Sequence, residues 1–106
     1  MSYAFVHRDG REEEDPPLSR LDDLLDELRE HENDVEHGSV AVLFESSALE
    51  VYRRGLMVFT PNLEADVVEQ FHLECKVDRD LVEVMRDLAE GRLAEVRALP
   101  WHPRNL

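Results

Sequence analysis

The chain has 106 residues, of which 42% are hydrophobic and 35% charged, so it holds enough apolar material for one ordinary domain over residues 1–106. Its net charge of −13 disfavours direct binding to nucleic-acid phosphates or anionic membranes and favours encounter with basic partners. A single cysteine, Cys75, excludes an internal disulfide and favours a reducing compartment.

Targeting and membrane signals are not visible in the sequence. The first residues lack the basic segment, long apolar segment and cleavage site of an export signal. The longest uninterrupted apolar run, residues 40–44, is far shorter than the roughly 20 residues that cross a bilayer. We therefore expect a cytoplasmic protein without a transmembrane segment.

The N-terminal third is predicted to form a strand, a loop and a helix. Residues 3–7 suit a short strand that ends in a turn at Asp9-Gly10. Residues 11–17 are charged or proline and predict a solvated loop. Ser19 and Asp22 have the spacing of a capping box. Leucines at helical spacing then predict an amphipathic helix over residues 19–32, namely Leu18, Leu21, Leu24, Leu25 and Leu28.

The middle of the chain is predicted to form consecutive strands. Residues 40–44 are continuously apolar, which suits a central strand that is buried on both faces. Residues 49–52 and 56–60 flank a glycine and predict a hairpin. Residues 70–77 alternate in character, and one face of that strand carries Phe71, Leu73, Cys75 and Val77.

The C-terminal third is predicted to be helical. Asp78 suits an N-cap, an apolar stripe follows over residues 79–90, and Gly91 suits the C-terminal end of that helix. Leu93, Val96 and Leu99 then indicate a further short helical turn, after which Trp101 could cover an edge of the core.

These elements predict an α+β fold. Consecutive strands with short connections favour an antiparallel meander of four or five strands, with helices 19–32 and 79–90 on one face. We expect six side chains to be buried in the core: Val42, Phe59, Phe71, Leu73, Leu81 and Leu88.

Acidity is concentrated near the N-terminus. Residues 1–38 hold thirteen acidic residues and four arginines, a net charge of −9. Opposite the leucines of the first predicted helix lies an acidic face, beside the acidic residues 12–15, formed by Asp22, Asp23, Asp26, Glu27 and Glu30. Such a face either keeps the protein soluble or binds a basic protein partner.

Other polar groups are weighed as sites and given structural roles. The sequence shows no nucleophile elbow around its serines and no glycine-rich phosphate loop, so we assign no catalytic residue and no cofactor. Cys75 is expected to be buried and inert. The remaining candidate metal ligands are expected to lie in a solvated loop or on the wet face of the sheet: His31, Asp34, Glu36, His37, His72 and Glu74.

The C-terminal quarter carries a family resemblance. Residues 81–101, which end in Leu-Ala-Glu-Gly-Arg-Leu-Ala-Glu-Val-Arg-Ala-Leu-Pro-Trp, resemble the close of small actinobacterial α+β proteins and, more faintly, of immunity proteins of polymorphic-toxin systems. The resemblance implies a cytoplasmic, non-enzymatic protein that neutralises a toxin by occupying its surface. It assigns no binding residue.

The sequence therefore favours a non-enzymatic acidic protein-binding domain, an immunity-type or inhibitory partner of a basic protein. One alternative is a small metal-dependent hydrolase or metal-binding module that uses His31, His37 or His72. Another is a homodimeric structural or regulatory module, since an open sheet has a wet face and unpaired edges. Both a monomer and a homodimer are compatible with the first interpretation.

Overall fold

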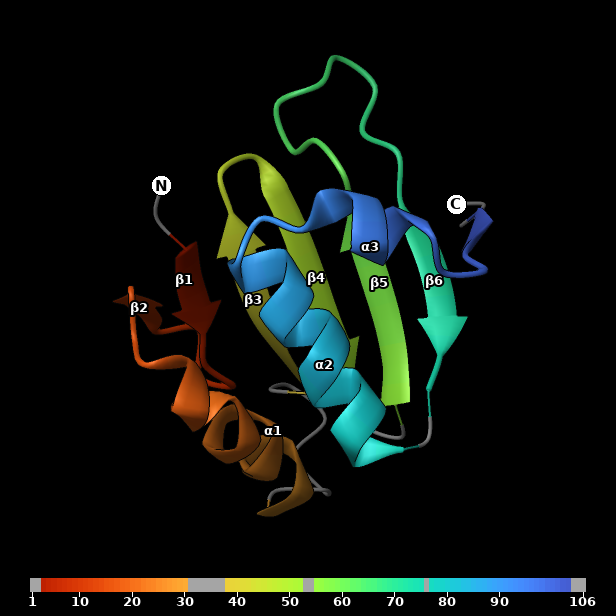
Figure 1. The fold of residues 1–106 in the computed structure, drawn as a ribbon. Helices are drawn as coiled ribbons and strands as arrows, with labels where there is room; N and C mark the ends of the chain where they lie inside the picture. Colours follow the sequence, from red (N-terminus) through yellow and green to blue (C-terminus); the bar gives the residue numbers. More distant parts are fainter. Residues whose placement is uncertain (1–2, 31–37, 53–54, 76, 104–106) are drawn as a thin grey trace.

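The computed structural model describes residues 3–30, 38–52, 55–75 and 77–103, and it has the predicted α+β fold (Figure 1). Within these residues, one antiparallel sheet contains the seven strands β1 (Tyr3–Val6), β2 (Glu12–Glu14), β3 (Ser39–Phe44), β4 (Ser47–Tyr52), β5 (Leu56–Thr60), β6 (Phe71–Glu74) and β7 (His102–Pro103). Their spatial order is β2-β1-β3-β4-β5-β6-β7. The helical elements are the 3-10 turn η1 (Leu18–Arg20) and the helices α1 (Leu21–Glu30), α2 (Asp78–Ala89) and α3 (Leu93–Arg97).

The sheet contains more strands than the predicted four or five. Its two edge strands, β2 and β7, were not predicted because they are short and lack a hydrophobic pattern. The prediction of a loop over residues 11–17 was wrong, since β2 lies within it and Glu13 pairs with Phe5 of β1. At the other edge, His102 of β7 pairs with His72 of β6. An edge strand made of three glutamates opposes pairing with a further chain.

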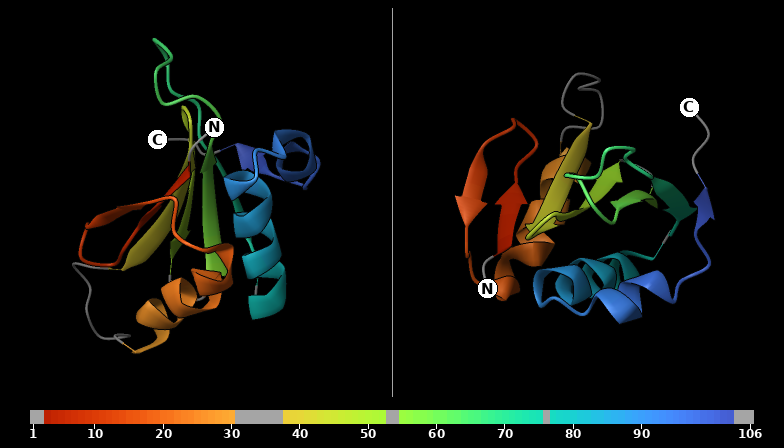
Figure 2. Two further views of the ribbon diagram at one scale, coloured as in Figure 1. Left: turned by 60° about the vertical axis from the view of Figure 1, so that its left-hand side comes forward. Right: turned by 90° about the horizontal axis from the view of Figure 1, so that it is seen from above.

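Helices α1 and α2 lie on the same face of the sheet, as predicted (Figure 1 and Figure 2). The leucine side of α1 is buried, and Leu21 and Leu28 are almost completely inaccessible. From α2, Leu81, Met85 and Leu88 enter the same core. The sheet supplies Phe5, Val40, Val42, Phe44, Leu49, Val51, Met57 and Phe59. None of the described helices is long and apolar enough to cross a membrane.

The predicted starts of the two main helices need correction. Instead of a capping box at Ser19 and Asp22, the chain enters α1 through η1, whose N-cap residue Pro17 makes no side-chain hydrogen bond. Asp78 is the first residue of α2 and not its N-cap, which is Val77. Both helices are stabilised instead by burial of their apolar sides, which contributes more than a cap.

Strand β6 is less buried than predicted. Phe71 and Leu73 pack against the core but are only partly buried, because β6 is next to the short edge strand β7. Cys75 is likewise partly buried, and its Sγ lies 3.6 Å from the carbonyl oxygen of Val77. Val77 itself is 53% exposed, so the predicted alternation ends before residue 77.

The end of α2 follows the prediction closely. Gly91 has a φ of +77°, a left-handed conformation that glycine adopts without strain, and the N–H of Arg92 donates to the carbonyl oxygen of Asp87. The helix α3 follows, and Trp101 then covers Phe59, with 5.5 Å between the ring centroids. The Trp101 Nε1–H donates to the carbonyl oxygen of Val96 over 2.7 Å.

Candidate protein-binding surface

The outer side of α1 carries three exposed carboxylates, from Asp22, Asp23 and Asp26, which together define the acidic face of α1. They lie opposite the buried leucines because successive residues of a helix are rotated by about 100°. Within the described part of the chain, none of the three forms a salt bridge. The sequence prediction thus places these three side chains correctly, in solvent and on one side of one helix.

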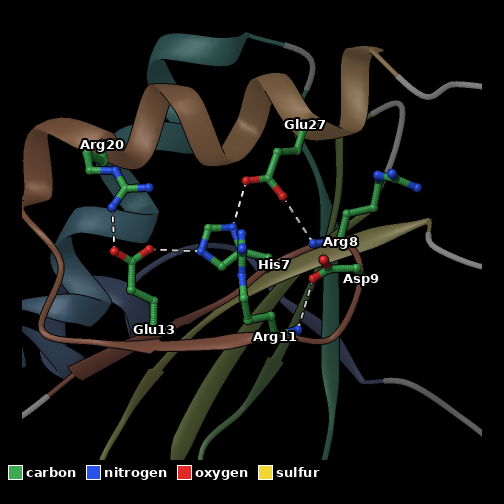
Figure 3. A network of polar contacts seen from close by, with 7 residues as sticks. All are labelled: His7, Arg8, Asp9, Arg11, Glu13, Arg20 and Glu27. Carbon is green, nitrogen blue, oxygen red and sulfur yellow. Dashed lines mark hydrogen bonds and ion pairs between the residues drawn. The ribbon is translucent and has the colours of Figure 1, made fainter.

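The other two residues predicted for this face differ from the first three. Glu30 is the last residue of α1, and its side chain lies outside the described part of the structure. Glu27 is only partly exposed, because its carboxylate is directed towards the end of β1 (Figure 3). Glu27 therefore links α1 to the end of β1. The exposed acidic face consists of the three aspartates.

The carboxylate of Glu27 contacts the ring of a buried histidine, His7. His7 is 4% exposed, and its Nδ1 lies 2.7 Å from Oε2 of Glu27 (Figure 3). Its other ring nitrogen, Nε2, lies 2.9 Å from Oε1 of Glu13. Because an ionised carboxylate only accepts hydrogen bonds, both contacts are hydrogen bonds when both ring nitrogens carry a proton. His7 thus joins two carboxylates that come from β2 and α1.

Two further donors complete this network, which we name the His7 network: His7, Arg8, Glu13, Arg20 and Glu27. The backbone N–H of Arg8 donates to Oε1 of Glu27 over 3.2 Å, so both oxygens of that carboxylate are bound. The guanidinium of Arg20 pairs with Oε2 of Glu13. The hydrogen bond from His7 is the main reason that the pKa of Glu13 is lowered, with the charge of Arg20 acting in the same direction.

The His7 network connects β1, β2, η1 and α1, four elements that follow one another in the sequence. It fixes α1 against the β1–β2 hairpin through side chains while the leucines hold its other side. This network was not predicted from the sequence, although His7 continues the alternation of Tyr3 and Phe5 on the core-facing side of β1. A histidine in phase with apolar strand residues was the available signal.

The positions of the acidic residues also bear on helix stability. Asp22 and Asp23 lie in the first turn of α1, where negative charge interacts favourably with the helix dipole. Asp26 lies beyond that turn and gains little from the dipole. The first two carboxylates thus have a structural benefit, whereas the third only adds like charge to the face.

Of the candidate metal ligands, the structure describes His72 and Glu74. His31, Asp34, Glu36 and His37 lie outside the described residues. His72 stacks obliquely on His102, with ring centroids 5.6 Å apart, on the face of the sheet away from the helices. Within residues 3–30, 38–52, 55–75 and 77–103, no group of three or more histidine, cysteine, aspartate or glutamate side chains could hold a metal ion.

Comparison of the chain with protein-family models, with curated proteins and with solved structures finds no match.

Proposed function

We propose that this protein binds a basic protein through the acidic face of α1 and acts as an immunity-type or inhibitory partner. One observation carries the proposal: Asp22, Asp23 and Asp26 are exposed on one side of a helix whose opposite side is buried. Unneutralised carboxylates held on one face attract a cationic surface and steer its approach.

The His7 network supports the proposal by holding α1 in place. A binding face on a fixed helix loses little conformational freedom when a partner binds, so more of the electrostatic attraction contributes to affinity. Two carboxylates at this end of the molecule, from Glu13 and Glu27, are already used by His7. The three aspartates remain available to a partner, and Glu27 keeps their helix in position.

A capture experiment in lysate of the native host tests the proposal. The test variant is Asp23→Lys with Asp26→Lys. The control is Asp80→Lys with Glu83→Lys, since these residues are also exposed and also occupy the third and sixth positions of a helix, α2. Both variants change the net charge by the same amount, so a difference between them reports where the charge lies.

We expect the wild type and the α2 variant to retain the same basic protein, and the α1 variant to retain at least tenfold less of it. Circular dichroism of each variant checks that its helices are intact. Equal retention by the two variants would mean that the acidic face of α1 only solubilises the protein.

A further inference from the structure

A second surface feature lies far from α1. The loop between β5 and β6, residues 61–70, projects beyond the end of the sheet that is opposite α1 (Figure 1 and Figure 2). We refer to these residues as the β5–β6 loop. Because it stands at the other end of the molecule, the acidic face of α1 and the β5–β6 loop are separate surfaces.

The β5–β6 loop exposes apolar side chains that contribute nothing to the core. Leu63 is 47% exposed, Val67 80% and Val68 43%. Among the described residues, Val77 is the only other large hydrophobic residue that is exposed to a similar extent. Solubility does not account for three such side chains in one loop, and exposed apolar surface beside polar residues is typical of protein-binding sites.

The base of the loop is held by hydrogen bonds to its neighbours. The hydroxyl of Ser47 donates to the carbonyl oxygen of Pro61 over 2.7 Å, and the N–H of Leu63 donates to the carbonyl oxygen of Ser46 over 2.7 Å. Within the loop, the N–H of Glu64 donates to Oδ1 of Asn62 over 3.0 Å. These bonds fix the first part of the loop against the β3–β4 turn, so the apolar side chains are presented from a defined base.

The charge around these side chains has one sign. The β5–β6 loop contains Glu64, Asp66 and Glu69, all exposed, and no lysine or arginine. Glu45, also exposed, adjoins the base of the loop through its neighbour Ser46. A partner that binds the loop must therefore offer an apolar surface that contacts the valines. It must also carry basic residues around that surface. A second copy of this loop fails the second condition, since like charges would meet.

We infer that the β5–β6 loop inserts Val67 and Val68 into a cleft of a partner protein, a cleft with an apolar floor and a rim of lysine or arginine. This goes beyond the proposed function, which concerns the opposite end of the molecule. The partner is a protein, because nucleic acids and anionic membrane surfaces carry the same sign of charge as the acidic residues of the loop.

Site-specific photo-crosslinking in the native host tests the inference. The full chain carries a photoreactive amino acid at position 67, and a second preparation carries it at position 77, where the native valine is also exposed. The crosslinked protein is identified by mass spectrometry and purified. Its affinity is then measured for wild type, for Val67→Ser with Val68→Ser, and for the control Val77→Ser.

Position 67 should crosslink to one protein within an apolar cleft with a basic rim, and position 77 should not. The double serine variant should bind that protein at least tenfold more weakly, because burial of a single valine corresponds to roughly a factor of ten. The Val77→Ser variant should bind as wild type does. Equal crosslinking at both positions, unchanged affinity of the double variant, or crosslinks to a second copy of this chain would overturn the inference.

Combining this test with the α1 charge reversal separates the two proposals. If position 67 does not crosslink to a partner but Asp23→Lys with Asp26→Lys reduces capture as expected, only the β5–β6 loop is refuted as an insertion site. Specific crosslinking at position 67 with no effect of Asp23→Lys and Asp26→Lys refutes only the acidic face. Failure of both experiments refutes both proposals.

Discussion

Nδ1 of His7 and Oε2 of Glu27 lie 2.7 Å apart, and this contact joins the end of β1 to the middle of α1. Replacing Glu27 by alanine leaves the ring nitrogen of His7 and the backbone N–H of Arg8 without this acceptor. We expect Glu27→Ala to lower the free energy of unfolding by about 1–3 kcal/mol. Urea denaturation measures the loss. The control variant Asp26→Ala should change the free energy of unfolding by no more than about 0.5 kcal/mol. Equal losses for Glu27→Ala and Asp26→Ala would refute a special role for Glu27.

The lowered pKa of Glu13 predicts a dependence of stability on pH. Because the folded state favours the ionised form, its contribution is complete above the ordinary glutamate pKa of about 4.3 and is lost as the pH falls through the lowered folded pKa. The free energy of unfolding of the wild type, measured with urea, should therefore exceed that of Glu13→Gln by the largest amount above about pH 5. The difference between the two free energies should shrink towards about pH 3. A difference that stays constant over this range would contradict the assignment.

We expect substitution of Gly91 to lower the stability of the fold more than substitution of Gly10. Both have positive φ, but a Cβ on Gly91 would lie 2.7 Å from Cζ of Phe44, whereas a Cβ on Gly10 meets nothing within 4 Å. Gly10→Ala should cost about 1–2 kcal/mol for the backbone alone, and Gly91→Ala roughly 1–3 kcal/mol more. Thermal unfolding compares them. Adding Phe44→Leu should recover part of the extra loss, and similar losses for both alanine variants would exclude the clash.

The core assignment is tested at Leu88, which is fully buried between α2 and the sheet. Leu88→Ala should cost about 2–5 kcal/mol, since it removes apolar contacts and leaves a cavity. Leu63→Ala, at an exposed position in the β5–β6 loop, serves as the control and should change stability by less than about 0.5 kcal/mol. A cost below about 1 kcal/mol for Leu88→Ala would show that the apolar side of α2 is misassigned.

The sequence predicted the parts of the fold in which hydrophobic periodicity and burial agree. Leu81, Leu88, Val42 and Phe59 are buried as expected, and both main helices cover one face of the sheet. Strand β2 could not be recognised, because three consecutive glutamates have no hydrophobic alternation and pair only when β1 is beside them. At an edge of a sheet, tertiary pairing overrides the local pattern.

The candidate surface was predicted only in part for a similar reason. Helical spacing alone identified the exposed positions of Asp22, Asp23 and Asp26. It also placed Glu27 among them, since spacing does not show which neighbouring element a long side chain can reach. The contact with His7 spans twenty residues of sequence and depends on how β1 and α1 pack, which no local pattern encodes.

The central claim, that the acidic face of α1 binds a basic protein, is tested most directly by association kinetics. The protein captured by the wild type is purified, and its association rate is measured by stopped flow over a range of salt concentrations. For wild type and for Asp80→Lys with Glu83→Lys, the rate should fall steeply as salt increases. For Asp23→Lys with Asp26→Lys, it should be at least tenfold lower at low salt and nearly independent of salt. Equal rates for the two charge-reversal variants at every salt concentration would contradict the claim.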